Sequence, residues 1–175
     1  MQNFLVQMAG WMGTGKSTIA HAVAAATGAI VLDHDTTKTA ILEAGVAHPP
    51  AGAASYAVVH AIAADLLLQG HSVIIDSASL YDSIPETGAS IAAQAKVRYL
   101  FAECQCPDDI ADGRITSRIN RPSQVATAAE AQGIRNDPNR KPARPAGAIL
   151  LDTTMAEEES INSLLSWLQS DVAET

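Results

Sequence analysis

Short apolar runs alternate with longer helix-forming segments along the whole chain. Five runs have the length of a strand and are bounded by polar or turn residues: 4–8, 29–32, 72–76, 97–102 and 148–152. Apolar spacing, composition and capping residues predict helices between and after them at 16–27, 36–43, 55–69, 85–95, 107–120, 126–132 and 155–169. Two prolines and a glycine predict a loop at 48–52. Strands that alternate with helices predict an α/β fold, a parallel sheet covered on both faces, in one domain over residues 1–175.

Residues 10–18 have the sequence Gly-Trp-Met-Gly-Thr-Gly-Lys-Ser-Thr and match the G-x-x-x-x-G-K-[ST] pattern of a phosphate-binding P-loop. A predicted strand precedes the motif and an Ala-rich predicted helix follows it, which is the context that the motif requires. Glycines let the backbone curl so that its N–H groups point inward at an anion. We therefore expect a nucleoside triphosphate, ATP, to be bound by Gly10, Gly13, Thr14, Gly15, Lys16, Ser17 and Thr18. Lys16 would reach the β- and γ-phosphates, and the Ser17 hydroxyl would ligate Mg²⁺.

Three aspartates stand where predicted strands end. Asp76 closes the third run, which favours a role in orienting Mg²⁺, although such an acid can also cap a turn. Asp33 and Asp35 are two residues apart, so both are expected to face the cleft from one side of the strand end. We expect Asp35 to act on the acceptor hydroxyl and Asp33 to lie nearer Mg²⁺ or the Lys16 ammonium. Either could also cap the helix that follows.

The charge of the chain is unevenly distributed. Its net charge is −8, yet seven of the eleven basic residues lie between 114 and 144 with only two acids, a local charge of +5 that leaves −13 elsewhere. This distribution predicts a site for a small polyanion such as ATP and disfavours a phosphodiester backbone as partner. Arg114 and Arg118 are four residues apart on a predicted helix, so they are expected to share a face directed at the phosphates. Residues 121–145 are Pro-rich and basic, which predicts a lid over the cleft, with the lid region spanning about 114–145.

The rest of the sequence bears on targeting segments, on the state of the cysteines and on metal binding. No signal peptide is visible, and no apolar stretch is expected to be long enough to span a membrane. Cys104 and Cys106 lack the spacing of a zinc site and are expected to be reduced thiols in a cytoplasmic protein. The five histidines have no metal-ligand spacing, and His34 is expected to point away from its flanking acids.

The order of these motifs resembles that of the small P-loop kinases. The resemblance rests on the P-loop, Asp33-x-Asp35-x-x-Lys38, the Gly-x-Ser-Val-Ile-Ile-Asp sequence at 70–76, and Arg114-x-x-x-Arg118 before a Pro-rich segment. Similar proteins include gluconate kinase, chloramphenicol phosphotransferase, the kinase domain of polynucleotide kinases and predicted kinases with an AAA-type label.

This resemblance implies a five-stranded sheet of order 2-3-1-4-5 and specific roles for several residues. Asp35 would be the acceptor-side base, and Arg114 and Arg118 the arginines of the lid helix. Lys38 stands where many members have an arginine that contacts the acceptor, and residues 77–95 lack an arginine that many members carry.

Taken together, the motifs predict an ATP-dependent phosphotransferase that moves the γ-phosphoryl group to a hydroxyl of a small molecule. The acceptor pocket is expected between Asp35, Lys38, residues 48–56 and residues 77–81, with candidate substrate contacts at Asp33, Asp35, Lys38, Tyr56 and Ser77. Two alternatives stay open: a polynucleotide 5′-hydroxyl kinase, and a nucleotide-binding ATPase or regulatory module without an acceptor. The guanine-specific N-K-x-D motif is absent from the sequence, whereas the acceptor, the choice between ATP and GTP and the oligomeric state are left undetermined.

Overall fold

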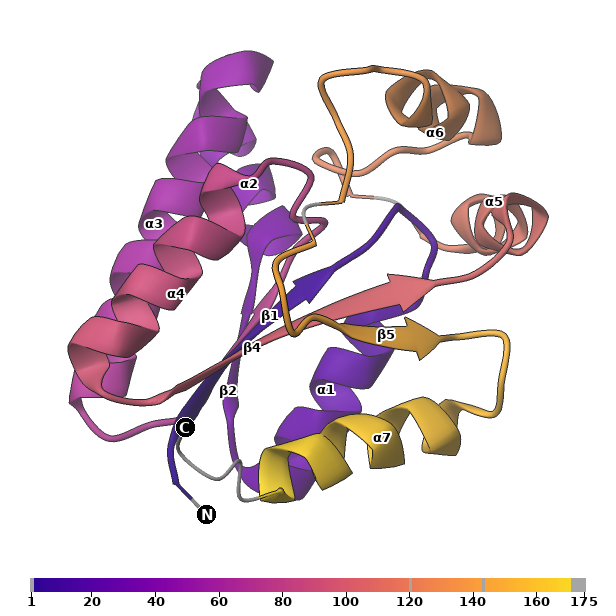
Figure 1. Cartoon of the computed structure of the whole chain (residues 1–175). Coiled ribbons are helices and arrows are strands. Elements are labelled where there is room, and N and C mark those ends of the chain that lie inside the picture. The colour runs from indigo at the N-terminus through magenta and orange to yellow at the C-terminus, as the bar shows by residue number, and fades with distance from the viewer. Residues whose placement is uncertain (1, 120, 143, 171–175) are drawn as a thin grey trace.

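The computed structural model describes residues 2–119, 121–142 and 144–170 as an α/β fold around a five-stranded sheet (Figure 1). All strand pairs are parallel, and the strand order is β2-β3-β1-β4-β5. This confirms the predicted fold class and strand order. The strands are β1 (Phe4–Ala9), β2 (Ile30–Asp33), β3 (Val73–Asp76), β4 (Arg98–Gln105) and β5 (Ile149–Asp152).

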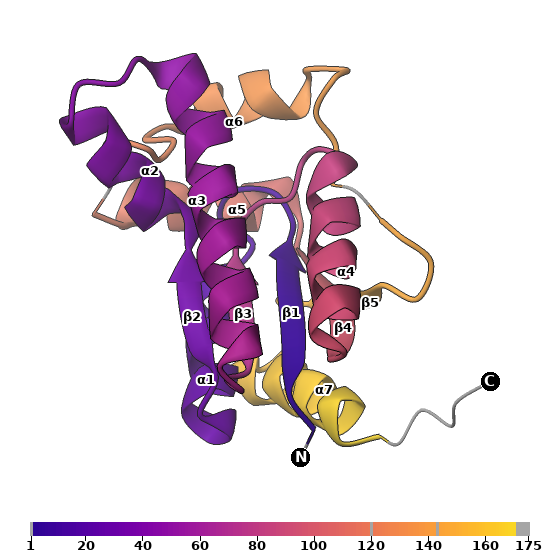
Figure 2. The same cartoon turned by 90° about the vertical axis from the view of Figure 1, so that its left-hand side faces the viewer.

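Helices connect the strands and cover both faces of the sheet. They are α1 (Lys16–Thr27), α2 (His34–Glu43), α3 (His48–Leu68), α4 (Ser83–Ala95), α5 (Asp108–Ser117), α6 (Ala128–Arg135) and α7 (Glu157–Gln169). Helices α1 and α7 lie on one face, and α3 and α4 on the other, as Figures 1 and 2 show from two sides. The molecule therefore has the three layers expected of alternating strands and helices.

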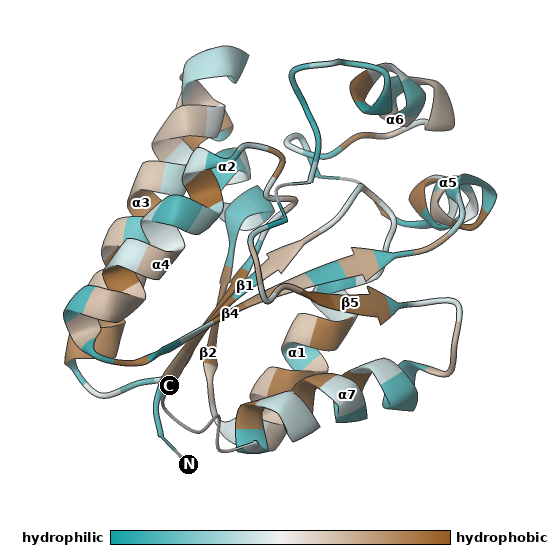
Figure 3. Cartoon of the chain, viewed as in Figure 1, coloured by the Kyte–Doolittle hydropathy of each residue, from teal (hydrophilic) through white to brown (hydrophobic). Residues whose placement is uncertain are grey.

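Two hydrophobic clusters hold these layers together, one on each face of the sheet. Alternate residues of a strand point to opposite faces, so Val6 belongs to the cluster under α1 and α7, and Leu5 to the cluster under α3 and α4. Both side chains are fully buried. Apolar colouring accordingly follows the strands and the inward sides of the helices (Figure 3). Burying each such side chain contributes about 1.5–3 kcal/mol to folding.

The carboxyl ends of the strands meet at one edge, and the segments that carry the polar motifs extend from there. The P-loop follows β1, α2 follows β2, and α5 and α6 lie beyond β4 at the same edge (Figure 1). In the β2–β3 register Asp33 pairs with Asp76, the last residues of their strands. Ligands of open parallel sheets bind at such an edge, so the topology brings the predicted site residues together.

Two boundary predictions are wrong. Residues 48–52 are not a loop: α3 begins at His48 with prolines in its first turn, where proline costs no hydrogen bond. Helix α5 ends at Ser117 instead of running to about residue 120, and Arg118 is extended with φ −88° and ψ 158°. Residue 120 itself lies outside the described part of the chain.

Helix α3 is long and apolar enough to cross a membrane by length and composition alone, which corrects the expectation that no stretch reaches this length. Part of its apolar surface has another explanation in the fold, whereas Val58, Ile62 and Leu68 are exposed. Val59, Ala63 and Leu67 are buried in the cluster that α3 forms with the sheet and α4. A single helix of this kind is weak evidence for a membrane protein, since core helices have the same composition.

Candidate active site at the carboxyl edge of the sheet

The backbone of the P-loop adopts conformations that only glycine accepts without strain. Gly10 and Gly13 have φ values of 126° and 82°. A Cβ atom on Gly10 would collide with the carbonyl oxygen of Cys104, and one on Gly13 with that of Ala111. These glycines therefore let the loop curl closely against β4 and α5, as the sequence motif predicts.

The P-loop leads directly into α1, whose first turn is left open. Gly15 is the N-cap in a left-handed conformation, and no side chain caps the helix, so the first N–H groups are available to an anion. The Lys16 ammonium and the Thr14 hydroxyl both donate to the carbonyl oxygen of Trp11, each at 2.8 Å. The P-loop thus holds the Lys16 side chain close to the backbone N–H groups at which phosphates would bind.

Ser17 and Asp76, the two predicted Mg²⁺ ligands, lie against each other. Asp76 is only 4% exposed. Burial raises the pKa of this carboxyl, while a hydrogen bond from Ser17 and the charge of Lys16 oppose the rise. No group of three or more His, Cys, Asp or Glu side chains that could hold a metal ion is found in the described ranges. One hydroxyl and one carboxylate nevertheless fit Mg²⁺, which takes few protein oxygens and completes its shell with phosphate and water.

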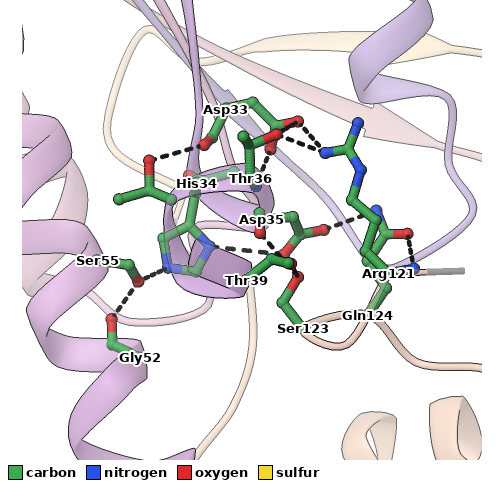
Figure 4. Close-up of polar contacts among 12 residues, drawn as sticks. Asp33, His34, Asp35, Thr36, Thr39, Gly52, Ser55, Arg121, Ser123 and Gln124 are labelled. Carbon is green, nitrogen blue, oxygen red and sulfur yellow. Dashed lines mark hydrogen bonds and ion pairs between the residues drawn. The ribbon is translucent and has the colours of Figure 1, made fainter. Parts of the chain in front are cut away.

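Asp33 has two structural partners at the start of α2 (Figure 4). Its carboxylate caps the helix by accepting from the backbone N–H of Thr36 at 3.0 Å. The same carboxylate forms an ion pair with Arg121, which comes from the Pro-rich segment. Burial raises the pKa of Asp33, but the hydrogen bonds from Thr36 and Arg121 and the Arg121 charge together lower it below its ordinary value. Asp33 is therefore an ionised anchor at neutral pH.

Asp35 lies in the first turn of α2 and is surrounded by polar groups (Figure 4). Gln124 donates to its carboxylate at 3.1 Å, and the Ser123 hydroxyl donates to its backbone carbonyl at 2.9 Å. His34 Nδ1 lies 3.7 Å from the carboxylate, and its Nε2 lies 2.7 Å from the Ser55 hydroxyl. Burial raises the pKa of Asp35, yet the hydrogen bonds from His34 and Gln124 and the charges of His34 and Lys16 lower it overall. Asp35 is thus a carboxylate, ready to accept a hydrogen bond.

Arg114 and Arg118 take up different positions in the site. Arg114 donates to the carbonyl oxygen of Thr153 at 2.8 Å and to that of Gly13 at 3.4 Å, which joins the P-loop to the segment after β5. Arg118 donates to the carbonyl oxygen of Val125 at 3.0 Å. The argument that both share one helical face is wrong because α5 ends before Arg118. Both side chains still line the same cavity, so their expected role at the phosphates stays a prediction.

One cavity of about 1620 Å³ is lined by most of the predicted nucleotide and acceptor residues, although Gly10 and Thr14 are not among its lining residues. Besides the P-loop, the residues predicted to contact acceptor or metal that line it are Asp33, Asp35, Lys38, Tyr56, Asp76 and Ser77. Burial raises the pKa of Tyr56 to about 12, so its hydroxyl stays protonated and hydrogen-bonds with Ser77. Ser77 also accepts from the buried Gln7 at 2.9 Å, which ties this wall to the core.

Three expectations about the acids and their neighbours need correction. Asp33 and Asp35 do not leave one strand face, because β2 ends at Asp33 and Asp35 is already helical. The cationic partner of Asp33 is Arg121 and not Lys16, whose ammonium donates to the P-loop itself. His34 does not point away from the acids, since one of its ring nitrogens faces Asp35.

Sequence reasoning missed two residues that contact the candidate base. Ser123 and Gln124 lie 88 and 89 positions from Asp35 and belong to no motif. The only indication in the sequence was the basic, Pro-rich composition around them, which predicted a lid without naming its contacts.

Comparisons with known proteins identify the family and the fold of the chain. The AAA domain family matches residues 5–136 of the chain. No curated protein sequence matches it. A sugar kinase from Janibacter sp. HTCC2649 shares the fold with a TM-score of 0.70 and 21% identity, over 99% of this chain and 96% of its own.

Two further solved structures have the same architecture. The APS kinase CysC of Mycobacterium tuberculosis, solved in complex with AMPPNP and APS, gives a TM-score of 0.74 and 19% identity over 97% of this chain and 99% of its own. A gluconokinase from Sinorhizobium meliloti 1021 gives a TM-score of 0.66 and 16% identity over 95% of this chain and 91% of its own. The chain belongs to the AAA domain family and has the fold of the small P-loop kinases.

Proposed function

We propose that the protein is an ATP-dependent kinase that transfers the γ-phosphoryl group to a hydroxyl of a small molecule. One observation carries the proposal: the P-loop and the ionised Asp35 line one cavity, and the basic segment contacts Asp33 and Asp35 there. The kinases that share the fold support the same reaction class.

The residues have distinct parts in this reaction. The P-loop N–H groups and Lys16 would bind the β- and γ-phosphates, and Arg114 and Arg118 would oppose the charge that spreads over the transferred group. Ser17 and Asp76 would hold Mg²⁺, which supplies charge neutralisation on the phosphate oxygens when it is bound.

Asp35 would orient the acceptor hydroxyl. As the acceptor oxygen bonds to the γ-phosphorus, the bond from that phosphorus to the β–γ bridging oxygen breaks and ADP leaves. The hydroxyl proton passes to the Asp35 carboxylate and then to solvent. The low pKa of Asp35 favours orientation and late proton acceptance over early abstraction, which suits a loose phosphoryl-transfer transition state.

The composition of the molecule favours a small acceptor over a polynucleotide. The chain has a net charge of −8, and several cavity-facing arginines already have protein partners, such as Arg121 with Asp33. A phosphodiester backbone needs an extended basic surface, which an acidic body does not offer.

A phosphotransfer screen tests the proposal. Radiolabelled ATP and Mg²⁺ would be incubated with sugars, nucleosides, antibiotics and 5′-hydroxyl oligonucleotides, and labelled products counted. We expect transfer to a small molecule, and loss of it in Lys16→Ala. Transfer only to oligonucleotides, or steady ATP hydrolysis that no alcohol changes, would contradict the proposal.

A further inference from the structure

The side chain of His34 lies between Asp35 on its own helix and Ser55 on α3 (Figure 4). Its Nε2 atom is 2.7 Å from the Ser55 hydroxyl, and its Nδ1 atom is 3.7 Å from Oδ1 of Asp35. His34 is only 8% exposed, whereas the Asp35 side chain is 41% exposed. A buried histidine thus contacts the candidate base, whose carboxylate is open to the cavity.

The hydroxyl of Ser55 determines which nitrogen of His34 carries a proton. Its oxygen lies 2.8 Å from the carbonyl oxygen of Gly52, so the one hydroxyl proton is donated to that carbonyl. Toward His34 the hydroxyl can then only accept, and Nε2 must carry a hydrogen. In a neutral His34, Nδ1 is therefore unprotonated, and its lone pair faces the Asp35 carboxylate.

The contact between His34 and Asp35 consequently depends on the charge of the histidine. In the neutral form, a lone pair and a carboxylate oxygen face each other and repel. A second proton, on Nδ1, turns the same contact into an ion pair in which a donor faces an acceptor. The ring has a fixed position for this contact, because the Tyr56 ring packs against it with centroids 3.9 Å apart and an angle of 31° between the planes.

The second oxygen of the Asp35 carboxylate has a partner of its own. Gln124 donates to Oδ2 at 3.1 Å, whereas His34 faces Oδ1. The Gln124 amide does not titrate, so of these two neighbours only His34 changes with pH. Each carboxylate oxygen has two acceptor positions, which leaves room for a hydrogen bond from an acceptor hydroxyl.

Other titratable groups surround this contact. On α3, Tyr56 keeps its proton, and burial together with the charge of His34 lowers the pKa of His60, so His60 titrates further to the acid side. The remaining charged groups near the pair are Lys16, Asp33, Lys38, Asp76, Arg118 and Arg121. Lysine and arginine side chains keep their charge in the pH range in which a histidine ordinarily titrates.

We propose that His34 is a positioning residue for phosphoryl transfer, which orients the Asp35 carboxylate toward the acceptor hydroxyl only while both of its ring nitrogens carry a proton. This inference rests on the proposed kinase function and adds a pH-dependent element to its acceptor side. The loss of the Nδ1 proton would replace attraction by repulsion at Oδ1 of Asp35. Transfer should then fall although Asp35 stays ionised.

Nuclear magnetic resonance tests the proton assignment without any turnover. Protein labelled with ¹⁵N at its histidines would be titrated between pH 5.5 and 8.5, with the His34 signals identified by their loss in His34→Gln. We expect the neutral form of His34 to carry its proton on Nε2. Ser55→Ala removes the acceptor of this proton and should move it to Nδ1, where it faces Asp35. A wild-type neutral His34 with its proton on Nδ1 would overturn the inference.

A second titration measures the effect of His34 on Asp35. Carboxyl ¹³C signals would be followed into the acid range, where histidines ordinarily carry both protons, and Asp35→Asn identifies the signal of Asp35. Burial raises the pKa of Asp35, and His34 is among the groups that lower it, so the midpoint should rise in His34→Gln. His71→Gln removes an exposed histidine that does not line the cavity and should leave the midpoint unchanged. Equal midpoints in the wild type and His34→Gln would overturn the contact.

The pH profile of transfer tests the positioning role itself. With the acceptor found in the screen, the wild-type kcat should fall at the midpoint that resonance gives for His34. His34→Gln should lack this step and should have a kcat at least about tenfold lower at the acid end, with an unchanged KM for ATP. Protonation of ATP affects every variant alike, and circular dichroism would show that each one folds.

These measurements separate the inference from the kinase proposal. Transfer whose pH profile has the same shape in the wild type and His34→Gln would overturn the positioning role, while the kinase proposal stands. No transfer to any alcohol would contradict the kinase and, with it, the role of His34 in transfer. The Nε2 proton and the Asp35 midpoint would in that case still establish the charge-dependent contact.

Discussion

Arg121 and Asp33 form an ion pair of 2.5 Å between residues that are 88 positions apart in the chain. The pair joins the Pro-rich segment 121–145 to the residue that caps α2. The first turn of this helix carries Asp35, whose carboxylate and carbonyl oxygen also accept hydrogen bonds from the same segment, through Gln124 and Ser123. The position of this Pro-rich segment and the orientation of the candidate base are therefore coupled through one short stretch of backbone.

Removal of the P-loop lysine should abolish nucleotide binding. Lys16→Ala deletes the ammonium that would neutralise the β- and γ-phosphates, and the fold should persist because Lys16 makes no core contact. Calorimetric titration with Mg²⁺ and AMPPNP measures the loss, and circular dichroism checks the fold. Lys141→Ala is the matched control. Unchanged affinity in Lys16→Ala would remove the basis for an ATP site here.

Neutralising Asp35 should impair transfer far more than nucleotide binding. Asp35→Asn keeps the size of the side chain but removes the charge that orients the acceptor hydroxyl. Phosphotransfer to the acceptor found in the screen should fall by about 10²–10⁴, the usual scale of general acid–base assistance, with nearly normal ATP affinity. Loss of ATP binding would instead place Asp35 at the metal, and normal transfer would leave it a structural residue.

The Arg121–Asp33 pair should stabilise the lid modestly. The Arg121 side chain is 48% exposed, so a double-mutant cycle with Arg121→Gln and Asp33→Asn should give a coupling of only about 0.2–1 kcal/mol. Limited proteolysis gives a second measurement, since Arg121→Gln should speed cleavage within residues 121–145. Mg²⁺ with AMPPNP should slow cleavage in the wild type. Equal cleavage with and without nucleotide would indicate a plain linker.

Asp76 should cost stability in the metal-free protein at neutral pH. Burial raises its folded pKa above the ordinary 3.8, so the folded state holds this proton more tightly than the unfolded state does. The resulting stability is complete below pH 3.8 and is lost as the pH rises through the folded pKa.

Asp76→Asn removes the buried charge and should therefore raise the melting temperature of the metal-free protein at pH 7, by an amount that shrinks as the pH falls. The same variant should lose the further stabilisation that Mg²⁺ with AMPPNP gives the wild type. Thermal unfolding between pH 3.5 and 8, with and without nucleotide, measures both effects. A lower melting temperature at pH 7 without metal would show that Asp76 is needed for its hydrogen bond with Ser17.

The sequence by itself determined the P-loop, the strands and the class of fold, because these depend on local patterns. Glycines at 10, 13 and 15 permit the loop backbone, and short apolar runs between helical segments require a buried parallel sheet. The order of the strands is a different matter. The strand order was predicted from the family resemblance, because the residues of an apolar run do not specify which strand it pairs with.

The tertiary structure alone decided how the site residues are paired. The sequence marked Asp33 and Asp35 as candidates, but whether each one caps a helix, binds a cation or faces the acceptor depends on segments nearly ninety residues away. Arg118 illustrates the same limit, because its helix ends before it and it reaches the cavity from extended backbone. Contacts of this kind arise from packing between distant elements, and no local pattern in the chain encodes them.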